Sequence, residues 1–313
     1  MVAYIIRRFV SAITVMVMVG VFIFLLLRLS PGDPAAVIAG DSAPPELIAG
    51  IRQQLGLGDP LPIQFVLWAK SILSGNFGTS IFTGRPVLQL VLQRLEPTIS
   101  LSVLTIIFSS ATGIAFGTLA AWRAGALVDR ALSAFAALAF SVPVFVVGYL
   151  LIYCFAISKH WLPVQGYEPV EHGLATWFAH LILPTVTLGL GYIALIARIT
   201  RASMLEVLAE DYMRTAAAKG ASSFSMLFHH ALKNAGVPIL TVIGLGFAYL
   251  ISGVVITETV FNIPGVGRLT VDAINNRDYP VIQGVLILAS GLYVMINLVV
   301  DLSYTLIDPR IRY

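Results

Sequence analysis

The sequence predicts an all-α membrane protein with six transmembrane helices and both chain ends in the cytoplasm. Its composition, its uncharged apolar segments and its distribution of basic residues support this class. Of the 313 residues, 58% are hydrophobic and 11% are charged, and the mean hydropathy is +0.90. A soluble domain carries roughly 25% charged residues. The composition therefore excludes an ordinary water-soluble protein.

The apolar segments have the length that crosses a bilayer, because about 20 helical residues span its hydrocarbon core. The first segment follows Arg7 and Arg8. Its apolar run is longer than that of a secretory signal peptide, so we interpret it as a retained span. The fourth segment is the shortest, and Pro184, Gly189 and Gly191 interrupt it. The predicted spans are about 9–29, 98–122, 132–157, 178–198, 236–258 and 280–302.

Lysine and arginine orient these spans, because cytoplasmic loops carry an excess of both. With the N-terminus inside, the cytoplasmic side collects eleven basic residues and the short outer loops hold three. The inner residues are Arg7, Arg8, Arg123, Arg130, Arg198, Arg201, Arg214, Lys219, Lys233, Arg310 and Arg312. They form no dense stripe, so the net charge of +3 indicates membrane topology and not nucleic-acid binding.

The first outer loop, 30–97, is predicted to be long and extracytoplasmic. Its proline and glycine clusters mark turns, and a short amphipathic helix is expected near Glu46 to Leu55. No soluble domain of ordinary size interrupts the spans. We therefore expect one membrane domain over residues 1–313.

The sequence contains none of the common catalytic or phosphate-binding motifs. A glycine-rich loop followed by Lys-Ser or Lys-Thr, His-Glu-x-x-His and Gly-x-Ser-x-Gly are all missing. The single Cys154 excludes an intrachain disulfide or a cysteine metal cluster. The spacing between His172 and His180 does not match a zinc-binding helix. We expect no catalytic residue, metal site or cofactor in this chain.

A polar segment, 206–235, lies between the fourth and fifth spans and is predicted to be cytoplasmic. Its residue pattern predicts a helix from Glu206 to Lys219, a helix end at Gly220 and a second helix from about Ser222. Glycine readily takes the left-handed conformation that ends a helix. Asp211 and Arg214 share one face at i,i+3 spacing. Such an element either connects two spans or presents a surface to a partner.

Two prolines and two carboxylates are candidates for pathway or gating residues. Pro143 and Pro184 are expected to kink their helices and free carbonyls that can line a pathway. Glu258 and Asp301 lie near span ends, where water or headgroups are expected to reach them. A structural or assembly role is favoured for these carboxylates over proton relay.

The whole chain resembles the membrane permease subunits of ATP-binding-cassette importers for dipeptides and oligopeptides, specifically the first of their two permeases. The motifs that carry the resemblance run from end to end. They include Leu29-Ser30-Pro31-Gly32-Asp33-Pro34, Phe77-Gly78-Thr79-Ser80, Thr257-Glu258-Thr259-Val260-Phe261, Pro264-Gly265-Val266-Gly267-Arg268, Arg277-Asp278-Tyr279-Pro280 and Asp308-Pro309-Arg310.

The segment from Asp211 to Leu232 is similar to the coupling motif of that family, Glu-Ala-Ala, three residues, then Gly. Arg214-Thr215-Ala216 occupies the start of the motif and Gly220 matches its glycine. The second half departs from the family pattern at His230 and Lys233. The resemblance implies that the residues coupling this chain to an ATPase are Asp211, Arg214, Thr215, Ala216, Ala217, Ala218, Lys219 and Gly220.

The resemblance further implies a type I importer permease fold in a bacterial inner membrane. The implied partners are a second homologous permease, two ATPase subunits that bind ATP and magnesium, and an extracytoplasmic substrate-binding protein. Peptides are the implied substrates, and glutathione or a nickel chelate are alternatives within the family. The runner-up is a proton-coupled secondary transporter that uses Glu258, Asp301 and His180.

Overall fold

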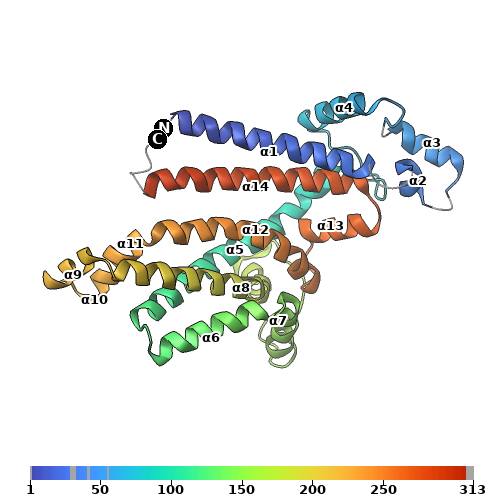
Figure 1. Cartoon of the computed structure of the whole chain (residues 1–313). Helices are drawn as coiled ribbons and strands as arrows, with labels where there is room; N and C mark the ends of the chain where they lie inside the picture. The colour runs from blue at the N-terminus through green and yellow to red at the C-terminus, as the bar shows by residue number, and fades with distance from the viewer. Residues whose placement is uncertain (1, 29–32, 41–42, 55, 308–313) are drawn as a thin grey trace. The chain divides into compact units, whose positions relative to one another are not determined.

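The computed structural model describes residues 2–28, 33–40, 43–54 and 56–307. Regular structure in these ranges is helical, with one isolated β-bridge between Thr79 and Pro86. Figure 1 shows the helices in chain order. They are α1 (Val2–Arg28), α2 (Pro34–Ala39), α3 (Pro45–Gln54), α4 (Leu61–Leu73), α5 (Val87–Trp122), α6 (Leu127–Ser141), α7 (Val144–Leu151), η1 (Ile152–Ile157), η2 (Val170–His172), α8 (Leu174–Leu208), α9 (Asp211–Ala218), α10 (Ser223–Ser225), η3 (Met226–Ala231), α11 (Leu232–Asn234), α12 (Gly236–Val260), α13 (Val266–Asn275) and α14 (Tyr279–Ile307).

The helices confirm the all-α membrane class. α1, α5, α8 and α14 are long and apolar enough to cross a membrane. The bent pair of Leu127–Ser141 and Val144–Ile157 adds a fifth span if it crosses as one unit. α12 covers the range predicted for the fifth span, but several of its side chains lie outside the described part. The total of six spans stays a prediction.

The chain divides into two compact units. One comprises Met1–Glu96 with Gly265–Leu298, and the other comprises Pro97–Pro264 with Val299–Tyr313. The single membrane domain expected from the sequence stays a prediction. Each unit is described by itself.

The first unit holds more helix in its outer loop than the sequence predicted. α3 confirms the expected amphipathic helix, and α2 and α4 add two more. Asp33 caps α2 by accepting a hydrogen bond from the Ala35 amide. The hydrogen bond from the Arg52 guanidinium holds the pKa of Asp33 below its usual range. The pair therefore links α2 to α3.

A buried carboxylate organises the turn before α5. The Asp278 side chain, only 4% exposed, accepts hydrogen bonds from Ser80 Oγ at 2.5 Å and from the Ile81 amide at 3.2 Å. Asp278 lies just before α14, so this network joins the turn to the start of that helix. A buried charge needs such partners, because its desolvation is otherwise costly. Behind the turn, Val87 and Val91 pack with apolar residues of α13 and α14.

α8 is the central helix of the second unit. In its most apolar stretch 67% of the residues are buried, against 11% in α1. It packs against α6, α7 and α12, and its contact with α5 is close. A Cβ added to Gly113 would lie 2.7 Å from Ile196 Cβ, so only glycine fits there. Glycine at helix contacts lets two backbones approach in a membrane protein.

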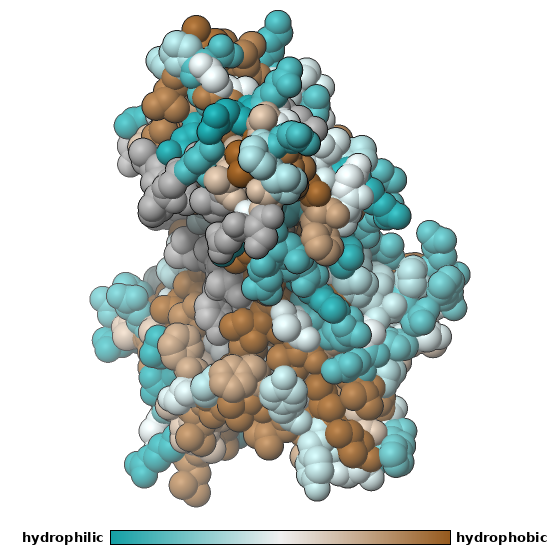
Figure 2. Space-filling view, turned by 90° about the vertical axis from the view of Figure 1, so that its right-hand side faces the viewer, coloured by the Kyte–Doolittle hydropathy of each residue, from teal (hydrophilic) through white to brown (hydrophobic). Residues whose placement is uncertain are grey.

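Figure 2 views one face of the molecule, turned from Figure 1. Hydrophilic side chains cover much of this face, with hydrophobic ones among them. Several helix flanks carry large exposed apolar side chains, such as Phe22 of α1 and Leu138 of α6, which are both 67% exposed. Such flanks suit contact with lipid or another membrane helix.

Candidate coupling segment and pathway elements

The segment between α8 and α12 begins with α9, an exposed two-turn helix. Asp211 and Arg214 lie on one face as predicted, with Arg214 Nη1 at 3.3 Å from Asp211 Oδ1. Their side chains are 95% and 80% exposed, so the ion pair adds little stability and both charges remain available to a partner. Thr215, Ala217 and Ala218 are exposed too. The face therefore has a low profile with charges at its edge.

α9 ends where the sequence predicted. Its last residue is Ala218, and Gly220 follows with φ of +83° in the left-handed region. No atom lies within 4 Å of a Cβ built on Gly220, so conformation and not space selects glycine at this position. The Gly220 amide donates to the Ala217 carbonyl and the Ala221 amide donates to the Ala216 carbonyl. These bonds satisfy carbonyls that the helix end would leave unpaired.

The second helix starts at the predicted place. Ser222 accepts a hydrogen bond from the Ser225 amide at 3.2 Å, which caps α10. The helix continues through η3, which is a π-helical turn over Met226–Ala231, to Asn234 at the end of α11. The two helices therefore form a helical hairpin around Gly220. We call residues 211–234 the coupling hairpin.

A small apolar core attaches the coupling hairpin to α8 and α12. Met213 is the one buried residue of α9, and it shares a cluster with Met204 of α8 and Ile239 of α12. Leu227 and Ala231 of η3 complete the contact. Burying an apolar side chain of this size stabilises its position by about 2 kcal/mol. A displacement of α9 will therefore also displace the parts of α8 and α12 that pack against Met213.

The helix predicted from Glu206 to Lys219 is wrong in one respect. The chain breaks at Ala209 and Glu210, and Glu210 is extended with ψ of 147°. After this break, Met213 of α9 lies in the apolar core with Met204 of α8. A helical propensity argument could not locate the break, because burial of one methionine decides the direction of the chain.

Sequence reasoning missed an exposed aromatic pair on the second helix. Phe224 and Phe228 are 65% and 44% exposed, and their ring centroids lie 4.5 Å apart. The spacing of Phe224 and Phe228 indicates such a pair, since residues at i and i+4 share one face of a helix. Exposed aromatic rings on a polar segment are typical of binding surfaces.

Pro143 breaks the third predicted span as expected. α6 ends at Ser141, α7 begins at Val144, and the two helices meet at 103°. Pro143 lacks an amide donor and restricts the residue before it, which favours an extended Val142. The bend leaves α7 and η1 crossing the direction of α6 (Figure 1).

Pro184 behaves differently, because α8 continues through it as one helix. Pro184 is buried among the residues of α8 that face the unit's core. Whether this proline acts in gating stays a prediction.

The sequence did not single out the close contact between α8 and α12. Tyr192 is fully buried, and its hydroxyl donates to the Ile243 carbonyl at 2.5 Å. A Cβ built on Gly246 would lie 1.8 Å from Tyr192 Oη. The tyrosine ring therefore occupies the space that this glycine leaves free.

Glu258 corrects one expectation about solvent access. It lies in the last turn of α12, is 0% exposed and accepts a hydrogen bond from Thr98 Oγ1 at 2.6 Å. The side chain is buried between helices and water does not reach it. This placement suits the structural role that the sequence favoured. Asp301 belongs to α14, and its side chain lies outside the described residues.

No metal site emerges from the described part of the chain, where no group of three or more His, Cys, Asp or Glu side chains converges. His172 instead pairs with Glu168 at 2.7 Å in the loop before α8. That hydrogen bond raises the pKa of His172, because the carboxylate favours the protonated ring.

Comparison with known families decides the identity of this helical membrane chain. Residues 113–313 match the family described as "Binding-protein-dependent transport system inner membrane component", and residues 1–102 match its N-terminal family. The chain belongs to this family. It is therefore a membrane permease of a transport system, and its membrane helices agree with an inner-membrane component.

Relatives match the permease over its whole length. It is 73% identical to the probable peptide ABC transporter permease protein y4tP of Sinorhizobium fredii, over 99% of each chain. It is 43% identical to the glutathione transport system permease protein GsiC of Salmonella choleraesuis, over 100% of each chain. It is 42% identical to a putative peptide transport system permease protein of Brucella abortus, over 100% of each chain.

A solved structure has the same fold as the permease. The similar chain comes from inward-facing conformations of the MetNI methionine ABC transporter, with a TM-score of 0.59 and 18% identity. The match covers 71% of the permease and 97% of that chain. This likeness confirms the type I importer permease fold.

Proposed function

We propose that the permease is one of two membrane subunits of an ATP-driven importer, and that it forms the pathway for short peptides together with a second permease. The single observation that carries the substrate class is the 73% identity to a protein named as a peptide permease. Glutathione is the second candidate, because GsiC is 43% identical over its full length. Glutathione is itself a modified tripeptide, so both candidates share the same chemistry.

The coupling hairpin is the proposed contact with an ATPase subunit. The exposed face of α9, with Ala217 and Ala218, fits a groove, and the charges of Asp211, Arg214 and Lys219 orient it. When two ATPases close around ATP and magnesium, they move this element. The apolar core at Met213 then transfers the movement to α8 and α12.

Four residues are proposed to line or gate the transport pathway. Pro143 sets the bend where α7 leaves α6, and such a break suits a gate that opens by a change of helix direction. Pro184, Glu258 and Asp301 are the other proposed positions. Glu258 would stabilise the packing of α12 against α5 through its hydrogen bond with Thr98.

The test purifies the tagged full-length permease from its native membrane in mild detergent and identifies copurifying subunits by mass spectrometry. We expect a second permease and two ATPase subunits. The complex is then reconstituted in liposomes with its binding protein and supplied with labelled di- and tripeptides or glutathione. ATP-dependent peptide uptake supports the proposal. Uptake that survives without ATP and collapses with a proton uncoupler contradicts it.

A further inference from the structure

Asp129 is the one buried residue of α6, a helix that the structure describes in full. It is 4% exposed, whereas the apolar Leu138 and Phe140 of the same helix are 67% and 57% exposed. The usual pattern is the reverse, because a charged residue is rarely buried unless it is paired. The buried attachment of α6 is therefore made by a carboxylate and not by an apolar side chain.

The partner of Asp129 is Arg201 of α8. Arg201 Nε donates to Asp129 Oδ1 at 2.5 Å, and Arg201 Nη2 donates to Oδ2 at 2.8 Å. Two parallel bonds of this kind fix the direction of the contact as well as its length. Asp129 also accepts from the Gly125 amide at 2.9 Å, in the turn between α5 and α6. One carboxylate thus joins that turn, the start of α6 and α8.

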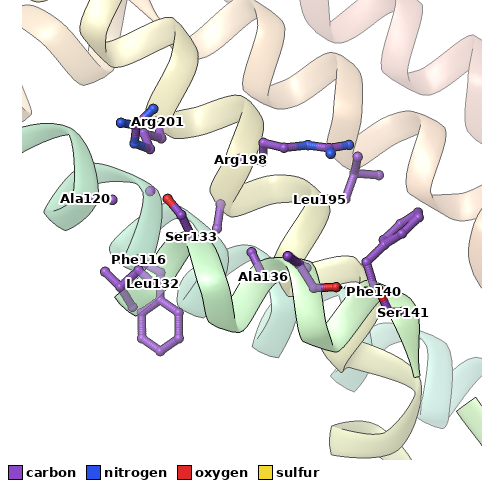
Figure 3. A pocket seen from close by; sticks show the side chains of 14 residues that line it. Phe116, Ala120, Leu132, Ser133, Ala136, Phe140, Ser141, Leu195, Arg198 and Arg201 are labelled. Atoms are coloured by element: carbon purple, nitrogen blue, oxygen red, sulfur yellow. Dashed lines mark hydrogen bonds between the residues drawn. The ribbon is translucent and has the colours of Figure 1, made fainter. Parts of the chain in front are cut away.

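A groove of about 460 Å³ lies along the rest of the contact between α6 and α8 (Figure 3). Arg201 and Ser133 lie toward one end of the groove and Phe140 lies toward the other. Alanines of both helices line much of the wall between these ends. Small side chains across a gap make few dispersion contacts, so they resist a relative movement of the helices only weakly. The ion pair is therefore the firm link between α6 and α8.

The other contact of α6 is with α5. The rings of Phe135 and Phe116 meet edge to face, with centroids 5.9 Å apart, but Phe135 is itself 37% exposed. Without the ion pair, α6 would be held by this half-exposed contact and by the exposed turn that precedes it.

The α8 end of the ion pair lies next to the core of the coupling hairpin. Met204 follows Arg201 by one helical turn, is 0% exposed and packs with Met213 of α9. A helix is rigid over one turn, so a displacement that reaches Met204 also moves Arg201. At its far end α6 leads into the bend at Pro143, where it meets α7 at 103°.

We propose that Asp129 is a positioning residue for transport, because its ion pair with Arg201 makes α6 follow α8 when the coupling hairpin moves. This inference rests on the proposed function of that hairpin. The movement reaches the bend at Pro143 through the ion pair, since the groove beside it carries little force. The pair thereby adds a third helix to the two that pack on Met213.

The first test follows the separation of α6 and α8 in the full-length permease, purified with its copurifying subunits. In a Cys154→Ser background, spin labels are attached at Leu138→Cys on α6 and Glu206→Cys on α8, which are both exposed sites. Their distance is measured without nucleotide and with magnesium and a non-hydrolysable ATP analogue. We expect one narrow distribution that the analogue leaves in place. A shift in this permease, whose ion pair is intact, overturns the proposal.

The second test separates positioning from stability by removing both charges. Asp129→Asn combined with Arg201→Met leaves no buried unpaired charge, so the thermal unfolding midpoint should stay near that of the unchanged complex. Uptake of labelled di- and tripeptides per ATP hydrolysed should nevertheless fall at least about fivefold, the low end of the usual coupling between two sites. The spin-label distance should broaden with the analogue. A merely structural pair predicts instead that coupling returns with stability.

Arg198→Gln is the matched control. Arg198 lies one turn earlier on α8, is exposed, and forms no ion pair among the residues that the structure describes. Its replacement should leave the midpoint, the uptake ratio and the distance unchanged. Arg201→Met alone should lower both the midpoint and the ratio, because it strands the buried carboxylate of Asp129.

Normal coupling together with a narrow, unshifted distance in the double variant overturns the proposal. If the double variant does not assemble, Arg201→Lys decides by the same measurements, because lysine keeps the charge but not the two-bond geometry. A normal ratio and distance in Arg201→Lys then overturn it. The distance measurement needs no peptide. Absent peptide uptake therefore contradicts the proposed function alone, and normal coupling in the double variant contradicts this inference alone.

Discussion

Tyr192 of α8 packs directly against Gly246 of α12. The phenol ring lies where a side chain at position 246 would begin, and its hydroxyl bonds to a backbone carbonyl of α12. A buried hydroxyl needs this partner, since an unsatisfied one costs about 1–3 kcal/mol. One residue pair therefore fixes both the separation and the register of two membrane helices.

Gly246→Ala should destabilise the permease by about 1–3 kcal/mol, because the new methyl group displaces Tyr192 and breaks its hydrogen bond. The measurement is the thermal unfolding midpoint of the purified protein in detergent. Gly236→Ala, in the first turn of the same helix, is the control, since a Cβ there meets no atom within 4 Å. Equal midpoints for the two variants would contradict the contact.

Asp278→Asn should loosen the turn at residues 80–84, because the amide accepts hydrogen bonds more weakly than the carboxylate that now bonds to Ser80 and Ile81. Hydrogen exchange of that turn is the readout, and it should become faster. Asp272→Asn changes an exposed carboxylate on α13 and should leave exchange at the turn unchanged. Unchanged protection in Asp278→Asn would show that the turn does not depend on this carboxylate.

At the scale of elements, α9 and the second helix of the coupling hairpin are joined by a single residue with positive φ. Gly220 has free space around it, so a larger residue fits but must adopt the left-handed conformation. That conformation costs roughly 1–2 kcal/mol for most residues and less for asparagine. The angle between the two helices therefore depends on backbone preference and not on packing at Gly220.

Gly220→Val should reduce peptide uptake relative to ATP hydrolysis, because a strained junction shifts α9 away from the ATPase. Gly220→Asn should keep most of the coupling, since asparagine tolerates positive φ. The ratio of transported peptide to hydrolysed ATP in proteoliposomes separates the two variants. Full coupling in Gly220→Val would mean that the hairpin angle does not matter for transport.

The elements that sequence reasoning located correctly are those that follow from local chemistry. Long apolar runs gave α1, α5 and α14, Pro143 gave the break after α6, and Gly220 gave the end of α9. The elements it missed depend on tertiary contacts. α4 is apolar but too short to be a span, so a search for long apolar runs passed over it, and the break at Glu210 accompanies the burial of Met213. The burial of Glu258 depends on a partner distant in sequence, Thr98, which no local pattern indicates.

At the scale of the whole chain, membrane orientation decides which surfaces meet which partners. The distribution of basic residues predicts that the coupling hairpin is cytoplasmic and the loop before α8 is outside. The family follows from full-length similarity, whereas the orientation follows only from charge.

Labelling of single cysteines tests the orientation. In a Cys154→Ser background, which removes the one native cysteine, Glu171→Cys should react with a membrane-impermeant maleimide in intact spheroplasts. Arg214→Cys should react only after the membrane is permeabilised. Both positions are exposed, so access through the membrane and not burial controls the reaction. The reverse pattern, or labelling of both from one side, would contradict the predicted topology.

The π-helical turn of η3 has a rotational consequence. An α-helix turns about 100° per residue, so one extra residue in a turn rotates everything before it by that angle relative to everything after it. Removing one residue from Met226–Ala231 would give an ordinary α-helix, yet it would swing Phe224 and Phe228 around the helix axis while α12 stayed in place. The angular phase between the aromatic pair and the membrane helix is therefore set by a single inserted residue.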